Sequence, residues 1–134
     1  MKNKIIGLLI AGFFYTGTSL FAQHVNMDSA AKSMGLKQYF FVMLSKGDLR
    51  NQDSATAAKI QEGHLNNIRQ LMGMGKMIVA GPFGDDSKWA GIFIFDCQTK
   101  EEVEGYLKTD PAVAAGRLIY DIHPWWTAKN CTFK

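Results

Sequence analysis

The run QYFFVML at residues 38–44 decides the fold. It is rich in aromatic and aliphatic residues and is followed by a polar loop, so it predicts a β-strand. Successive side chains of a strand point to opposite faces, which divides the run into two sets. One set is Tyr39, Phe41 and Met43, and the other is Phe40, Val42 and Leu44. Both sets are apolar, so both faces of this strand are expected to be covered.

The rest of the chain alternates helical and strand patterns around that strand. A polar loop at residues 45–53 leads to a predicted helix over residues 54–72, with Ser54 as its N-cap. The next elements are expected as strands at 77–80 and 89–95, a helix at 100–108, a helical turn at 112–115 and a strand at 118–123 that Pro124 ends. The order βαββαβ predicts an α+β, ferredoxin-like sandwich with an antiparallel sheet.

This order of elements predicts that both helices cover the same face of the sheet, because both crossovers are right-handed. The other face is nevertheless apolar, since the strand at 89–95 also carries apolar residues on both sides. An antiparallel sheet with two apolar faces and helices on only one of them needs a partner. The simplest partner is a second copy related by a two-fold axis, so the sequence predicts a homodimer.

The N-terminus predicts a secretory signal peptide at residues 1–22. Lys2 and Lys4 precede an apolar run at 5–14, and Ala22 precedes a polar residue, as at a cleavage site. A membrane span needs about 20 apolar residues, so we expect no stable membrane insertion after cleavage and a periplasmic or secreted protein. A retained N-terminal anchor is the alternative. A leader at 23–36, a domain at 37–126 and a C-terminal tail at 127–134 would follow the signal.

Charge and cysteine content exclude several kinds of partner. Cleavage removes two of the 15 basic residues and no acidic one, which reduces the net charge from +3 to +1 and gives no electrostatic case for nucleic acid. The three histidines are dispersed, so neither a metal nor another cofactor is expected. An oxidising compartment would permit a disulfide between Cys97 and Cys131, although a buried residue and a free thiol are equally consistent with the spacing.

His64 is the first candidate for a chemical role. It lies in the apolar stripe of the predicted helix, with Ile60, Ile68 and Leu71 at helical spacing. An imidazole can exchange a proton near neutral pH, so this residue is a candidate acid or base. A core histidine bonded to a backbone carbonyl is the alternative. Gly63 beside it would allow another element or a ligand to approach closely.

Asp110 is the second candidate, and it also has a structural explanation. A carboxylate directly before Pro111 is a natural N-cap for the helical turn that follows. Candidate walls for a pocket near the two residues are aromatic. They are Phe41, Phe83, Trp89 and Phe93.

An ordered set of short motifs resembles the YciI-like (YCII-related) domain family. The set is His64-Leu65, Gly75, Ala80-Gly81-Pro82, a strand, and TDPAVAAG at residues 109–116, and the resemblance covers residues 37–126. It implies the dimeric α/β-barrel form of the ferredoxin-like fold. It also implies a His–Asp pair that lines a pocket, and this pair maps onto His64 and Asp110.

Together these features predict a cofactor-free enzyme of the lyase or isomerase type. His64 and Asp110 would perform acid–base chemistry on a small, flat organic molecule, for which an aromatic compound is a candidate. No serine or cysteine is placed as a nucleophile beside the histidine. A non-catalytic periplasmic dimer that binds or senses a small ligand is the alternative, and cofactor-free oxidation is a third function compatible with such a barrel.

Overall fold

The structure of the protein is a computed structural model, and residues 27–129 are the part of the chain that it describes. Its elements are α1 (Met27–Ser33), β1 (Leu36–Lys46), α2 (Ser54–Gly73), β2 (Met77–Pro82), β3 (Trp89–Phe95), α3 (Lys100–Lys108), α4 (Pro111–Ala114) and β4 (Leu118–Ala128). The predicted signal peptide and Cys131 lie outside the described residues.

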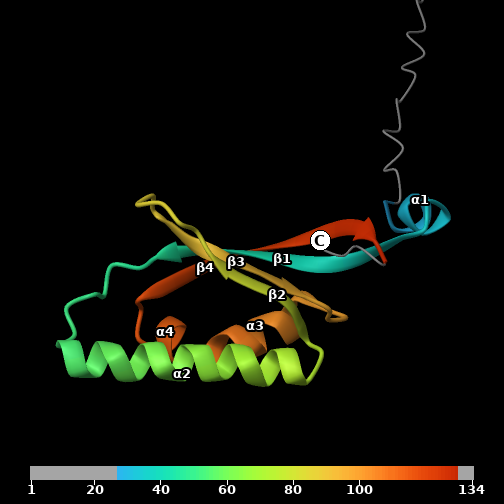
Figure 1. Ribbon diagram of the computed structural model, residues 1–134. Coiled ribbons are helices and arrows are strands. Elements are labelled where there is room, and N and C mark those ends of the chain that lie inside the picture. The colour runs from blue at the N-terminus through green and yellow to red at the C-terminus, as the bar shows by residue number, and fades with distance from the viewer. Residues whose placement is uncertain (1–26, 130–134) are drawn as a thin grey trace, which may run out of the picture.

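The four strands form one antiparallel sheet in the order β2-β3-β1-β4. Helices α2, α3 and α4 all lie against the same face of this sheet, and within residues 27–129 no helix covers most of the other face (Figure 1). This arrangement confirms the predicted α+β, ferredoxin-like sandwich, including the placement of both crossover helices on one side.

The last strand is longer than the sequence predicts. We expected Pro124 to end it, but β4 continues to Ala128, and Pro124 lies opposite Phe40 of β1. Proline lacks an N–H group and is tolerated where the nitrogen side of a strand faces away from its neighbour. Because β4 is an edge strand, it has such a side, and the expected strand end was wrong.

Two details in the N-terminal half of the described chain also differ from expectation. The N-cap of α2 is Asp53 and not Ser54, since the Asp53 carboxylate accepts a hydrogen bond of 2.9 Å from the backbone N–H of Thr56. An aspartate is as good an N-cap as a serine, so the sequence offers two neighbouring candidates. The expected leader at 23–36 contains the short helix α1.

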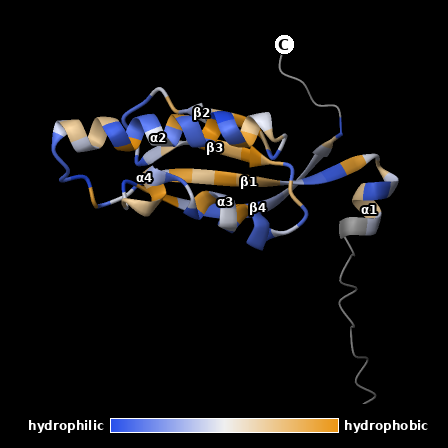
Figure 2. Cartoon of the chain, turned by 90° about the horizontal axis from the view of Figure 1, so that it is seen from below, coloured by the Kyte–Doolittle hydropathy of each residue, from blue (hydrophilic) through white to orange (hydrophobic). Residues whose placement is uncertain are grey.

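The hydrophobic core lies between the sheet and the helices. Alternate residues of β1 and β3 pack there against one side of α2 and α3. In Figure 2 the middle of β1, seen between α2 and α3, is coloured hydrophobic. The core side chains include Phe40, Val42, Leu44, Leu71, Phe93, Phe95, Val103 and Leu107. The helix-covered face of β1 is therefore the one that carries the even-numbered residues of the run at 38–44.

The helix-free face of the sheet is apolar over β1 and β3, whereas β4 also presents Asp121 and His123 there. The register places Phe41 opposite Ile94 on β3 and Tyr39 opposite Trp125 on β4. Ile119 of β4 is 56% exposed and Trp125 is 38% exposed. The two apolar faces expected from the sequence are thus present, and the homodimer inferred from them stays a prediction.

Among residues 27–129, no helix is both long enough and apolar enough to cross a membrane. Cys97 follows β3 and is buried as a free thiol. Burial raises the pKa of this thiol to about 11, and the nearby Glu102 carboxylate acts in the same direction.

Candidate functional site

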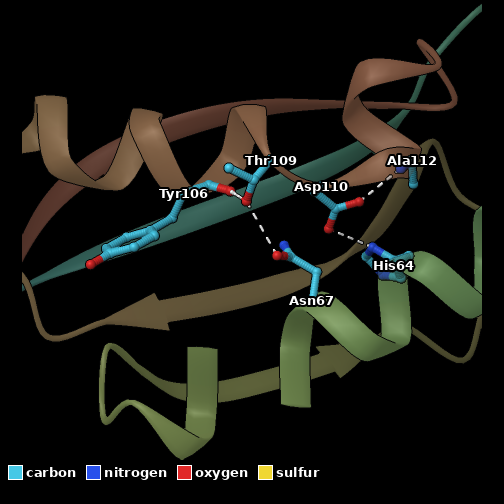
Figure 3. Close-up of polar contacts among 6 residues, drawn as sticks. All are labelled: His64, Asn67, Tyr106, Thr109, Asp110 and Ala112. Atoms are coloured by element: carbon cyan, nitrogen blue, oxygen red, sulfur yellow. Dashed lines mark hydrogen bonds and ion pairs between the residues drawn. The ribbon is translucent and has the colours of Figure 1, made fainter. Parts of the chain in front are cut away.

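His64 and Asp110 are brought into direct contact by the packing of α2 against the segment before α4. The Nδ1 atom of His64 lies 2.7 Å from Oδ2 of Asp110 (Figure 3). The His64 side chain is 12% exposed and that of Asp110 is 1% exposed. A histidine bonded to a backbone carbonyl was the alternative for this position, and the structure shows a carboxylate as its partner.

Asp110 uses both carboxylate oxygens. While Oδ2 contacts His64, Oδ1 accepts a hydrogen bond of 2.8 Å from the backbone N–H of Ala112 and so caps α4. Burial acts to raise the pKa of this carboxyl, but the hydrogen bond and charge of His64 and the backbone N–H groups at the start of α4 outweigh it. The pKa of Asp110 is therefore lower than usual, which keeps it an anion facing the imidazole. Asp110 is therefore both the N-cap of α4 and the hydrogen-bond partner of His64.

Gly63 permits this contact. A Cβ atom at Gly63 would lie 2.9 Å from Cγ of Pro111, closer than side chains approach one another. The absence of a Cβ atom lets α4 pack closely on α2, and this packing explains why a glycine occupies the interior of α2. A second link lies one residue before Asp110, where the Thr109 hydroxyl contacts the Asn67 side chain at 3.2 Å (Figure 3).

His64 lines a cavity of about 400 Å³ between α2 and the sheet. The ring of Phe93 is stacked on the imidazole with a centroid distance of 6.1 Å and an interplanar angle of 30°. Phe83 and Trp89 also line the cavity, and their rings are 6.4 Å apart. Three of the four aromatic residues expected near the histidine therefore line the same cavity as His64.

Phe41 is the exception, and its expected place in the pocket was wrong. It pairs with Ile94, on the helix-free face, whereas Phe93 points to the helix-covered face that holds the cavity. Both sets of alternating residues in β1 are apolar, so the sequence did not distinguish the two faces.

The geometry leaves one ring nitrogen of His64 for chemistry. Because the ionised Asp110 accepts the Nδ1 hydrogen, a neutral imidazole carries its lone pair on Nε2. A histidine held this way can accept a proton from a molecule in the cavity and return it. The buried carboxylate stabilises the imidazolium that forms between these two events.

Three basic residues of the cavity were missed by the sequence analysis. Lys46, Arg50 and Arg117 line it together with His64. Lys46 is the last residue of β1, Arg50 lies in the loop before α2, and Arg117 directly precedes β4. No motif links these positions, and only the pairing of Lys46 with Leu118 in the β1–β4 register would have predicted their proximity.

Possible ligands for a metal ion are dispersed in the described part of the chain. Within residues 27–129, no group of three or more His, Cys, Asp and Glu side chains is arranged to hold a metal. His123 lies on β4 opposite Phe41, away from the cavity.

Comparison with known proteins identifies the family. No curated protein matches the chain. Among solved structures, the chain is similar to the 5-chloro-2-hydroxyhydroquinone dehydrochlorinase of Burkholderia phenoliruptrix AC1100 in complex with 2,5-dihydroxybenzoquinone. The two are 23% identical with a TM-score of 0.47, and the match covers 64% of this chain and 92% of the other. The family model of the YCII-related domain matches residues 39–126, the segment that contains the whole sheet core and both His64 and Asp110. The chain therefore belongs to the YCII-related domain family.

Proposed function

We propose that this protein is an enzyme that moves protons with His64 on a small, flat organic molecule bound in the cavity. The observation that carries the proposal is the 2.7 Å contact between His64 Nδ1 and the almost fully buried Asp110. A buried carboxylate that fixes the orientation of an imidazole at a cavity wall is a common arrangement for acid–base catalysis. In this arrangement His64 is the catalytic residue and Asp110 positions it.

The proposed reaction begins when Nε2 of His64 accepts a proton from a carbon or oxygen of the substrate. The electron pair that is released forms a new double bond within the substrate. If a leaving group departs with its own bonding pair, and His64 then gives its proton to that group or to water, the reaction is that of a lyase. If His64 returns the proton to another atom, it is that of an isomerase. In both cases the imidazolium is present only during turnover, next to the Asp110 anion.

The walls of the cavity support a flat substrate. Phe93 lies beside the imidazole, while Phe83 and Trp89 form an aromatic pair on the same cavity. Aromatic walls favour offset or edge contacts with a second ring, so a small aromatic molecule would be held with its plane fixed relative to Nε2.

The test is a screen of the purified protein against small phenols, lactones and halogenated acids, with turnover followed by chromatography. We expect His64→Gln to lower turnover by a factor of about 10²–10⁴. The matched control is Lys59→Gln, an exposed residue of the same helix that does not line the cavity, which should retain full activity.

Two outcomes would contradict the proposal that this protein is an enzyme. A large fall in the melting temperature of His64→Gln would indicate a core histidine whose role is structural. Tight binding of a screened compound without turnover, unchanged in His64→Gln, would instead favour the non-catalytic ligand-binding or sensing module.

We also propose that the protein is a homodimer joined through the helix-free face of the sheet. Support comes from apolar side chains there, among them Ile119 and Trp125, that no other element of the described chain covers. Light scattering at micromolar concentration should give the mass of two chains, and Ile119→Glu should shift it toward one chain because it places a charge in the interface. A monomeric wild-type protein would refute the dimer.

Export of the protein is proposed on the pattern of residues 1–22. The test is intact mass spectrometry of the protein from the extracytoplasmic fraction of an expressing bacterium. A chain that begins at Gln23 is expected. A full-length chain in the membrane fraction would point to a retained anchor.

A further inference from the structure

Positive charge is concentrated at one end of the cavity. Lys46, Arg50 and Arg117 line it, and Asp85 contributes a single carboxylate to the same lining. The three cationic residues come from the end of β1, the loop after it and the start of β4, which lie at the same end of the molecule (Figure 1). Residues 23–134 carry a formal net charge of only +1, so this local excess is not a reflection of their composition.

None of the three cationic side chains forms an ion pair with a carboxylate within residues 27–129. Asp85 is itself engaged, since it accepts a hydrogen bond of 2.9 Å from the Ser87 hydroxyl. Like charges gathered at one cavity repel one another, and an anion between them relieves the repulsion.

Two of these side chains are held in place by neutral groups. A guanidinium nitrogen of Arg50 donates to the backbone carbonyl of Arg117 at 3.1 Å, and a guanidinium nitrogen of Arg117 donates to Oε1 of Gln52 at 2.7 Å. A guanidinium has five N–H donors, so each tether leaves most of them available. The tethers therefore orient the cations without neutralising their charge.

From this arrangement we propose that the cavity binds a small aromatic acid, with its carboxylate at Lys46, Arg50 and Arg117 and its ring on the aromatic wall near His64. This names the substrate class of the proposed function and rests on it. An arginine pair matches the planar fork of a carboxylate, and Phe93 and Trp89 match the ring. The carboxylate would set which ring atom faces Nε2 of His64.

The experiment compares two probes that differ in charge and hardly in shape. Benzoate and benzamide are titrated into the purified protein, and binding is followed by calorimetry and by the NMR signals of the His64 ring. Benzoate should bind the wild-type protein at least about tenfold more tightly than benzamide, and its affinity should fall as salt is added.

The variant that tests the site is Arg50→Gln, with Lys59→Gln as the matched control. Both remove one positive charge from an exposed position, but Lys59 does not line the cavity. Arg50→Gln should weaken benzoate by roughly tenfold and leave benzamide unchanged, whereas Lys59→Gln should affect neither. Arg117→Gln provides a second test if Arg50→Gln proves unstable.

Several results would overturn the proposal. These are equal binding of benzoate and benzamide, no binding of either, or an equal loss of benzoate affinity in Arg50→Gln and Lys59→Gln. Inorganic phosphate that competes as tightly as benzoate would show a site for free anions, in which the ring plays no part. The same titrations on His64→Gln separate this proposal from the enzymatic one. A preference for benzoate that His64→Gln retains, together with a wild-type protein that turns over no screened compound, supports the acid site and counts against the catalytic role.

Discussion

His64 and Asp110 are 46 residues apart in the sequence, yet His64 Nδ1 lies 2.7 Å from Asp110 Oδ2. The histidine is in the middle of the longest helix, and the aspartate is the N-cap of the shortest. The contact between them joins the orientation of a ring in the cavity to the start of α4. Changes at Asp110 therefore affect both stability and the protonation of His64, and suitable substitutions can separate the two.

Asp110→Asn should lower turnover by a factor of about 10²–10⁴ with a small change in stability. The asparagine oxygen can still accept from Ala112 N–H, but its amide then donates to Nδ1 of His64 and moves the imidazole proton to Nε2. Turnover and melting temperature are the measurements. Asp53→Asn, at the N-cap of α2, makes the same chemical change away from the cavity and should leave turnover unaltered. Activity within about twofold of wild type in Asp110→Asn would contradict the positioning role.

The low pKa of Asp110 predicts a loss of stability in acid. A carboxyl whose pKa is lower in the folded state than in the unfolded state stabilises the fold fully above its unfolded pKa of about 4. That contribution disappears as the pH falls through the folded-state pKa. Urea unfolding from about pH 6 to about pH 2 should therefore show a steeper decline for wild type than for Asp110→Asn. Parallel curves for the two proteins would show that the carboxylate is not specifically stabilised.

Gly63→Ala tests the close packing of α2 and α4. The added methyl group would meet the Pro111 ring at 2.9 Å, so α4 must move away, at a cost of about 1–3 kcal/mol that exceeds the gain in helix propensity. The control is Gly105→Ala in the interior of α3, where a Cβ meets nothing within 4 Å. This second variant should be stabilised by up to about 1 kcal/mol. Thermal unfolding measures both, and similar melting temperatures would contradict the packing argument.

Cys97 should be unreactive in the folded protein. Burial raises the pKa of its thiol to about 11, so the thiolate that attacks alkylating reagents is scarce at neutral pH. In a Cys131→Ser background, modification by iodoacetamide followed by mass spectrometry should be slow in buffer and fast in urea. Rapid modification of the native protein would show that the region around Cys97 opens.

The sequence predicts the elements that have a strong pattern. The strand at 89–95 and the helix at 100–108 have the predicted bounds, because a continuous apolar run marks the strand and the Thr99 cap marks the start of the helix. The end of β4 was not predicted, since whether proline is tolerated depends on the strand being at an edge. That is a property of the sheet order, which local pattern does not contain.

The site was predicted in part for a similar reason. The apolar stripe singles out His64, and the Asp-Pro pair singles out Asp110, but only the resemblance to a family joined them. The face of Phe41 was ambiguous because both faces of β1 are apolar. The basic residues at 46, 50 and 117 carry no pattern, as they approach one another only through long-range strand pairing.

The position of β1 in the sheet has a consequence for the order in which the molecule can assemble. Among residues 27–129 it is the first strand to be synthesised, but its two neighbours are β3 and β4, and β4 is the last element of this described part. The backbone N–H and C=O groups along one edge of β1 therefore stay unpaired until residues 118–128 are available, and a chain interrupted before that point would expose an open edge. Truncated forms of this protein are expected to aggregate, and any chaperone that accompanies synthesis must protect this strand until the chain is complete.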